Sequence, residues 1–162
     1  MNEVKSLFEP KSVVLIGSSR ITEKVGMTSP QMFESVVHNM TKFFDGKTHV
    51  VDVEGKKGEK TLERLPGTPE LGVVMLPPRL SLEQSENCAK LGVKAIVILT
   101  GGFKVAQRQS LLSLKKEHDV RILGPNTIMG VINTVNGLNT TFERDVMPPK
   151  GTISVLSLIH IS

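Results

Sequence analysis

Short runs rich in Val, Ile and Leu recur along this chain of 162 residues, and segments with helical character separate them. The first run, Val13-Val14-Leu15-Ile16, has no polar alternation, which is typical of a strand buried on both faces of a parallel sheet. Further runs occupy residues 49–53, 72–76, 95–99, 121–123 and 153–156. This alternation predicts an α/β fold: a doubly wound parallel sheet in three αβα layers with right-handed crossovers.

The segments between the runs carry helix and loop signals. Residues 27–44 and 105–119 place apolar side chains three to four positions apart, as amphipathic helices do. Residues 81–91 begin with Ser81, a candidate N-cap that would accept a hydrogen bond from the first helical turn. Residues 54–70 are rich in Gly, Lys, Glu and Pro, which predicts a loop with a short helical turn.

The last thirty residues predict a change of organisation. Residues 133–152 are irregular and rich in Asn, Thr and Pro, as in a loop or a connection between domains. Residues 153–156 read as the start of a strand, but the sequence stops six residues later without a cap or a tail. We therefore expect one domain over residues 1–152, with residues 153–162 as the truncated start of a following domain or a non-native tail.

The composition excludes several classes of protein. Six Phe with no Trp or Tyr give few rings on which single-stranded nucleic acid could stack. The net charge of +4 suits an anionic ligand, but no block of Lys and Arg is dense enough for a nucleic-acid surface. The N-terminus has Glu3 and Glu9 and no long apolar core, so neither a signal peptide nor a membrane span is predicted. A cytoplasmic location without nucleic-acid or membrane partners is the expectation.

The nucleophilic and metal-binding residue types show no catalytic pattern. One cysteine, Cys88, excludes an internal disulfide and a multi-cysteine metal site. It lies in a helix-like segment, so we expect a small, partly buried side chain rather than a nucleophile. The four histidines lie far apart in sequence, and neither a Ser–His–Asp set nor a pair of carboxylates has a spacing that indicates catalysis.

A candidate phosphate site follows the first apolar run. Gly17, Ser18 and Ser19 come directly after it, and Arg20 and Lys24 add positive charge. Glycine at that point can adopt a positive φ and lets the backbone approach a ligand. If a helix begins there, its unpaired N–H groups and its dipole favour an anion, typically a phosphate.

The loops after the other runs extend this candidate site. Ligands of open parallel sheets bind outside the carboxyl ends of the strands, so these loops should share one edge. They are small, rich in Gly or Pro, or cationic, and they contain Lys56, Pro77, Thr100, Gly101, Gly102 and Asn126. Loops of this kind favour such residues in any case, so the indication comes from five loops on one edge rather than from one of them.

Two familiar nucleotide sites fit less well. The chain has no G-x-G-x-x-G, because Gly26 is the next glycine after Gly17, and it has no G-x-x-x-x-G-K-[ST]. Asp52 could contact a ribose hydroxyl in an NAD(P)-binding oxidoreductase domain, but Lys56 and Lys57 nearby favour a phosphate. An NAD(P) domain and a nucleotide-sensing regulatory module stay open as alternatives. In a third alternative, Arg20, Lys24 and Lys56 are surface charges that bind no ligand.

Three stretches resemble a known family. Residues 12–26 read SVVLIGSSRITEKVG, residues 100–103 read TGGF, and residues 121–134 read RILGPNTIMGVINT. Together with Lys56 and Leu76-Pro77, this ordered set resembles the CoA-binding domain of ADP-forming acyl-CoA synthetases, which is related to the α subunit of succinyl-CoA synthetase. The resemblance extends over residues 7–156.

The resemblance implies a Rossmann-like domain that holds CoA across the strand ends. The phosphates of CoA would meet the first loop and nearby cations: Gly17, Ser18, Ser19, Arg20, Lys24 and Lys56. The pantetheine arm would lie along Pro77, Thr100, Gly101 and Gly102, with Asn126 toward the thiol. Backbone amides with Arg and Lys suit these phosphates chemically.

The chain departs from the family pattern at three places. Glu54-Gly55 stand before Lys56 where the family has Asn-Pro, and Thr127 stands where it has Cys. The family's phosphohistidine domain and ATP-grasp module are not among these residues, and His160 is not a credible phosphohistidine. The resemblance therefore implies a CoA-binding module that needs further domains or a partner subunit, and that would not catalyse ligation alone.

Overall fold

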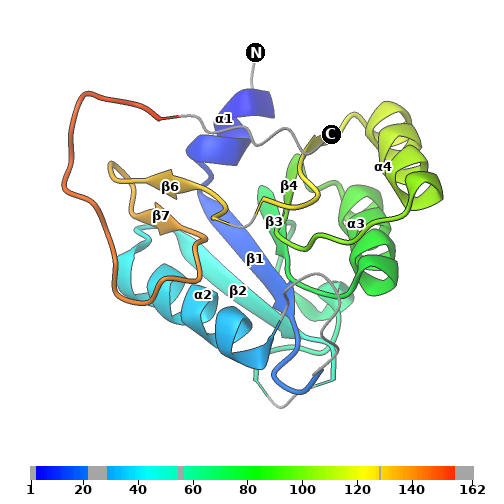
Figure 1. Cartoon of the computed structure of the whole chain (residues 1–162), viewed down its shortest axis with the longest axis horizontal. Coiled ribbons are helices and arrows are strands. Elements are labelled where there is room, and N and C mark those ends of the chain that lie inside the picture. Colours follow the sequence, from blue (N-terminus) through cyan, green and yellow to red (C-terminus); the bar gives the residue numbers. More distant parts are fainter. Residues whose placement is uncertain (1–2, 22–28, 55–56, 128, 156–162) are drawn as a thin grey trace.

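The computed structural model describes residues 3–21, 29–54, 57–127 and 129–155. Figure 1 shows strands and helices in alternation along the chain. The helical elements are α1 (Glu3–Phe8), α2 (Pro30–Phe43), the 3-10 turn η2 (Leu62–Arg64), α3 (Pro78–Leu91) and α4 (Val105–His118). The strands are β1 (Ser12–Gly17), β2 (Lys47–Asp52), β3 (Leu71–Val74), β4 (Ala95–Ile98), β5 (Arg121–Leu123), β6 (Ile132–Asn133) and β7 (Leu138–Asn139).

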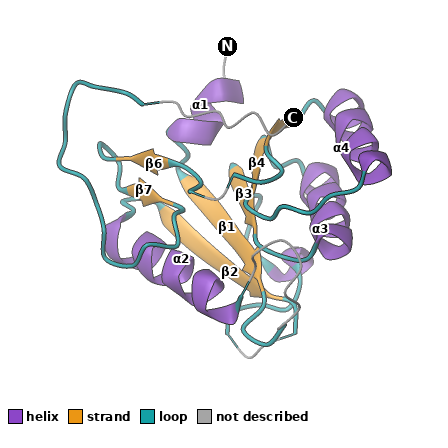
Figure 2. Cartoon of the chain, in the orientation of Figure 1, coloured by secondary structure: helices purple, strands orange, loops and turns teal. Residues whose placement is uncertain are grey.

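Five strands form one parallel sheet in the order β2-β1-β3-β4-β5. The chain therefore builds outward from β1 in both directions, first to β2 and then to β3, β4 and β5. Figure 2 shows α2 on one side of the sheet and α3 and α4 on the other. This arrangement confirms the predicted doubly wound, Rossmann-like α/β fold, and its order of strands changes direction at β1.

The sheet is buried on both faces, as the unbroken apolar runs predict. Consecutive residues of β1 enter opposite cores: Val13 and Leu15 pack with Phe33 of α2, whereas Val14 and Ile16 pack on the side of α3 and α4. These four of the six β1 residues are completely buried. Burial of a side chain of this size stabilises the fold by roughly 1.5–3 kcal/mol.

α3 begins earlier than the sequence signals predict. Ser81 is not its N-cap, because the helix starts at Pro78, where a fixed φ and a missing N–H suit the first helical position. Ser81 is instead fully buried, and its hydroxyl donates to the carbonyl of Leu76 at 2.5 Å. The other end agrees with ordinary helix chemistry, since Gly92 closes α3 in the left-handed region with φ 92°.

The C-terminal part corrects two expectations. Residues 133–152 are not wholly irregular, because β6 and β7 pair as a short antiparallel hairpin. Residues 153–155 do not form a strand; no other strand lies beside them in the described part of the chain, and Ile153 and Val155 are 88% and 87% exposed. Leu156 lies outside the described residues. The domain boundary after residue 152 stays a prediction.

A segment of residues 140–146, the C-terminal strap, runs along α2 after the hairpin (Figure 1). Asn39 of α2 is completely buried, and its side chain forms hydrogen bonds with three backbone groups of the strap. The Asn39 side-chain amide donates to the carbonyls of Thr141 and Glu143 at 3.0 and 2.9 Å, and its oxygen accepts the N–H of Asp145 at 3.0 Å. On the outer side, Lys42 Nζ lies 2.6 Å from Asp145 Oδ1.

Candidate functional site

The order of the strands places the candidate site at the carboxyl edge of the sheet. β1 has β2 on one side and β3 on the other, so the chain leaves β1 and β3 in opposite directions. Open α/β sheets bind ligands in the crevice at this change of direction. Gly17 ends β1 and Pro77 follows β3 as the N-cap of α3, so both predicted residues lie at this edge beside the change of direction.

The loop after β1 is folded by its own hydrogen bonds. The hydroxyl of Ser18, which is 4% exposed, accepts the N–H groups of Arg20 and Ile21 at 3.0 and 3.1 Å. The N–H of Ser19 donates to Oδ1 of Asp52 at 3.1 Å. These three amides therefore bond within the chain, whereas the side chain of Arg20 is exposed and available to an anion. In this loop a ligand phosphate would meet side chains more readily than these amides.

Gly17 is required for space rather than for its φ. Its φ is not positive, in contrast to the expectation from the sequence. A Cβ at Gly17 would instead overlap the ring of Phe33, which is 1% exposed and part of the core beneath the loop. The glycine therefore lets α2 pack directly against the end of β1.

Asp52 at the end of β2 does not present its carboxylate to solvent. It is 1% exposed, and its second oxygen lies 3.4 Å from the N–H of Lys57, a long hydrogen bond. Together with the bond to Ser19, this occupies both carboxylate oxygens with backbone donors. An NAD site uses such an acidic residue to accept ribose hydroxyls, so this geometry does not favour the NAD(P) alternative.

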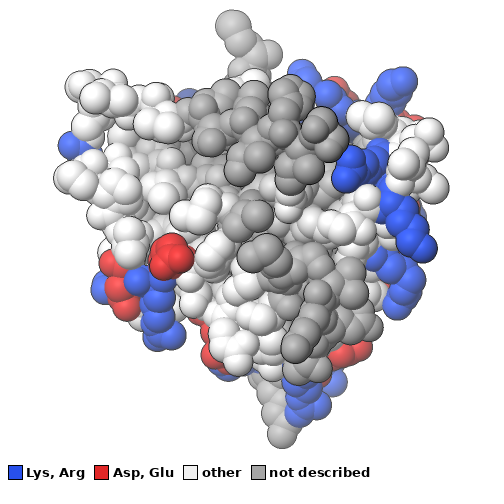
Figure 3. Space-filling view, in the orientation of Figure 1, with Lys and Arg blue, Asp and Glu red and all other residues white. Residues whose placement is uncertain are grey.

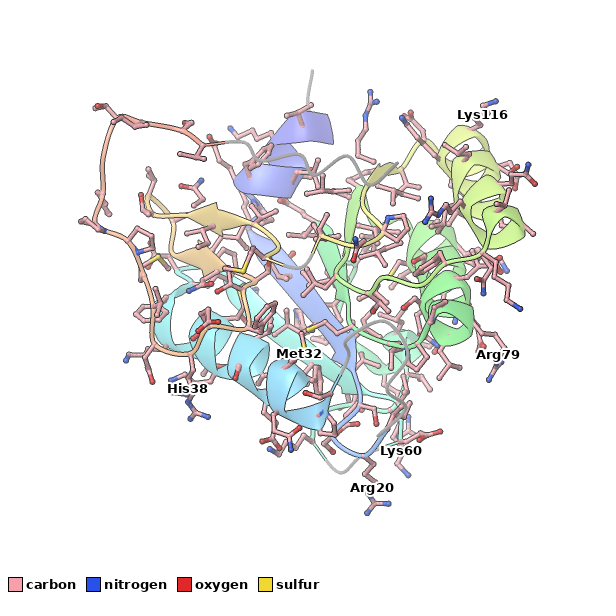
Figure 4. All side chains as sticks on the ribbon, viewed as in Figure 1. Arg20, Met32, His38, Lys60, Arg79 and Lys116 are labelled. Atoms are coloured by element: carbon pink, nitrogen blue, oxygen red, sulfur yellow. The ribbon has the colours of Figure 1, made fainter. Side chains whose placement is uncertain are left out.

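Cations gather at this end of the molecule. Lys24 and Lys56 lie outside the described residues, so their predicted place beside a phosphate stays a prediction. In Figure 4, Arg20 and Lys60 project from the same lower end of the molecule, and the space-filling view shows Lys and Arg side chains there (Figure 3). Lys60 was not among the predicted site residues; the signal for it was a second cation shortly after Lys57 in the loop that follows β2.

The loops after β4 and β5 lie in direct contact. The N–H of Asn126 donates to the carbonyl of Thr100 at 2.9 Å. A Cβ at Gly101 would lie 2.6 Å from Oδ1 of Asn126, so only glycine allows this approach. Gly102 and Asn126 have φ values of 78° and 74°, in the left-handed region that Gly and Asn tolerate.

Thr127 has a structural role at the position where the family pattern has Cys. Its hydroxyl donates to the carbonyl of Ile98, the last residue of β4, at 2.8 Å. This bond ties the β5 loop to the sheet.

Thr100 has a buried hydroxyl without a hydrogen-bond partner. It is completely buried at the end of β4, and its hydroxyl is the one buried side-chain polar atom in the described part of the chain without a hydrogen-bond partner. Buried polar groups are nearly always paired in native proteins. The loop that contacts Asn126 therefore holds one unpaired buried hydroxyl.

Other chemistries find no support in the described residues. Over the ranges that the structure covers, no group of three or more His, Cys, Asp and Glu is placed to hold a metal ion. Cys88 is completely buried, and burial raises the pKa of its thiol to about 12, so it is not a nucleophile. None of the helices described is long and apolar enough to cross a bilayer.

Comparisons with known proteins identify the family of this chain. Residues 11–133 match the family described as the CoA binding domain. The chain is 34% identical over 164 residues to an ADP-forming acetate–CoA ligase of Methanocaldococcus jannaschii, covering 96% of this chain and 22% of the relative. It is 28% identical to the α subunit of ADP-forming acetate–CoA ligase II of Pyrococcus furiosus, covering 93% of this chain and 33% of the relative.

A solved structure gives the same fold. The dinucleotide-forming acetyl-coenzyme A synthetase 1 of Candidatus Korarchaeum cryptofilum, in complex with phosphate and ADP, superposes with a TM-score of 0.73 at 26% identity. The match covers 88% of this chain and 31% of that structure. This chain thus spans about a fifth to a third of the length of the relatives it matches. The family match and the fold together show that the chain belongs to the CoA-binding domain family.

Proposed function

We propose that this chain is the CoA-binding part of an ADP-forming acyl-CoA synthetase. The observation that carries the proposal is that the loops after β1, β3, β4 and β5 leave the parallel sheet at one edge, where the loops after β4 and β5 are in contact. The family match supplies the ligand class, and the relatives' names supply the reaction class. In such an enzyme CoA is a substrate that leaves as the acyl thioester.

The proposed binding mode follows the charge and burial along this edge. The phosphates of CoA lie at the cationic end, against Ser19, Arg20 and the predicted Lys24 and Lys56, because charge-assisted hydrogen bonds to phosphate are strong. The less polar pantetheine arm lies against buried Pro77 and the Thr100–Gly101–Gly102 loop. The thiol lies toward Asn126, which contacts Gly101 and is exposed.

The ligase reaction itself needs chemistry that we assign to other parts of the protein. The phosphohistidine and the nucleotide-binding ATP-grasp module that the family resemblance implies would belong to further domains or a partner subunit. Acyl phosphate would give its phosphoryl group to the histidine and its acyl group to CoA. The part described here would hold CoA and contribute no group to phosphoryl transfer.

Isothermal titration calorimetry with CoA tests this proposal. Folded protein should bind CoA, and Arg20→Ala, Lys24→Ala and Lys56→Ala should each weaken binding while leaving the circular dichroism spectrum unchanged. Lys115→Ala, near the far end of α4, is the matched control and should bind as the wild type does. Absence of heat with a folded sample would refute the proposed function. Unchanged affinity in all three site variants would refute the assigned site.

A further inference from the structure

The carboxylate of Asp52 connects two loops that border the proposed phosphate end of the site. One loop follows β1 and contains Ser19, and the other follows β2 and contains Lys57. Oδ1 accepts the N–H of Ser19 at 3.1 Å, and Oδ2 lies 3.4 Å from the N–H of Lys57. With 1% of its surface exposed, Asp52 contacts both loops from the side of the sheet.

The loop after β2 is also held to α2 at its outer side. Lys57 Nζ lies 2.6 Å from Oε1 of Glu34 in α2, but both side chains are well exposed, at 57% and 42%. An exposed ion pair of this kind contributes little to stability. The buried carboxylate of Asp52 contributes more, because water cannot take its place as the acceptor for the two amides. Asp52 is therefore the buried side chain that connects the loops, beside the backbone bond from the N–H of Val53 to the carbonyl of Gly17 at 3.0 Å.

Asp52 and Ser18 hold the backbone of the first loop and leave the side chain of Arg20 exposed. The hydroxyl of Ser18 fixes the turn by accepting the N–H groups of Arg20 and Ile21, and the carboxylate of Asp52 accepts the N–H of Ser19. Arg20, the residue after Ser19, is exposed. The position from which Arg20 reaches an anion thus depends on the bond between Ser19 and Asp52.

We propose that Asp52 is a positioning residue for CoA, which sets the geometry of the phosphate-facing loops without touching the ligand. This inference rests on the proposed function, because it takes the ligand to be CoA. A carboxylate at the end of β2 otherwise indicates a ribose contact, so the proposal assigns a different role to that position in this chain.

The first experiment compares ligands with and without phosphates. Asp52→Ala removes both bonds and should raise the Kd for CoA about tenfold. Without these bonds the loops that contain Ser19 and Lys57 no longer hold their side chains in one orientation toward the phosphates. The Kd for pantetheine, followed by NMR chemical shifts, should stay unchanged because pantetheine has no phosphate. Asp52→Asn keeps one acceptor oxygen and should recover part of the affinity. Glu34→Gln, the matched change of a neighbouring exposed carboxylate, should bind both ligands as the wild type does.

The second experiment measures the connection without a ligand. Hydrogen exchange of the Ser19 and Lys57 amides should be faster in Asp52→Ala than in the wild type. If Asp52→Ala does not fold, Asp52→Asn takes its place in both measurements. Unchanged or tighter CoA binding in both variants, or an equal loss for pantetheine, would overturn the positioning role. If the wild type binds no CoA, the proposed function fails instead, and unchanged amide exchange would then refute the connection as well.

Discussion

Replacement of Gly17 by alanine should destabilise the domain through a single contact. A Cβ at this position would overlap the ring of Phe33, with Cε2 at 2.6 Å and Cγ at 2.7 Å, far inside van der Waals contact. Phe33 is 1% exposed and packs in the core with Val13, Leu15 and Val36, so its ring has no space into which it could move. Overpacking of a close-packed core costs about 1–3 kcal/mol, and we expect Gly17→Ala to lower the free energy of unfolding by that amount.

A double-mutant cycle identifies the contact. Phe33→Ala removes all three ring atoms that the new methyl group would meet, so Gly17→Ala should cost at least about 1 kcal/mol less in the Phe33→Ala background than in the wild type. Urea unfolding followed by circular dichroism gives all four free energies of unfolding. Gly151→Ala is the matched control, because a Cβ there has no atom within 4 Å. A Gly17→Ala effect below about 0.5 kcal/mol, or an equal effect in both backgrounds, would refute the steric explanation.

Three further predictions concern other parts of the structure. Asn39→Ala leaves three backbone groups of the C-terminal strap without their partner, and urea unfolding should show that the free energy of unfolding falls by about 2–3 kcal/mol. A negligible change would contradict this role of Asn39. Hydrogen bonds from Lys42 and His38 lower the pKa of Asp145 from 3.8 to about 2. The stabilisation from this carboxylate is therefore complete above pH 3.8 and is lost as the pH falls toward 2; an NMR titration of Asp145 that stays near 3.8 would contradict it, and Lys42→Ala should move the titration upward. Cys88, whose thiol pKa burial raises to about 12, should react with a thiol reagent in urea but not in the folded protein; fast reaction without urea would contradict its burial.

The parallel sheet could be predicted because its strands carry an unusual signal. A run such as residues 13–16 without polar alternation has few alternatives in a soluble protein, and the structure places its side chains alternately in two cores. β5 begins and ends at the predicted residues, Arg121–Leu123, and η2 supplies the short turn expected within residues 54–70. Periodicity and burial act locally here, so the sequence contains them directly.

The parts that the sequence did not reveal depend on contacts between distant segments. Nothing near Asp52 in sequence indicates that one of its carboxylate oxygens accepts the N–H of a residue 33 positions away. Gly17 could not be distinguished from a positive-φ glycine, because its constraint is the ring of Phe33 on another element. The unpartnered hydroxyl of Thr100 likewise becomes visible only once every neighbour is in place.

The start of α3 was missed for a local reason. Ser81 and Pro78 both offer a plausible helix start, and the proline prevailed because its ring already has the helical φ. α1 was also not predicted; it has only six residues, of which Leu7 packs against the core.

Attachment of the C-terminal strap to α2 has a mechanical consequence. Asn39 and Phe33 belong to the same helix, the first bonded to the strap and the second pressed against Gly17. A force applied to the segment after residue 146 would therefore be carried by α2 and not by the hairpin alone. Because a helix transmits load along its axis as a stiff rod, such a force would reach the end of β1, where the loop of Ser19 and Arg20 begins.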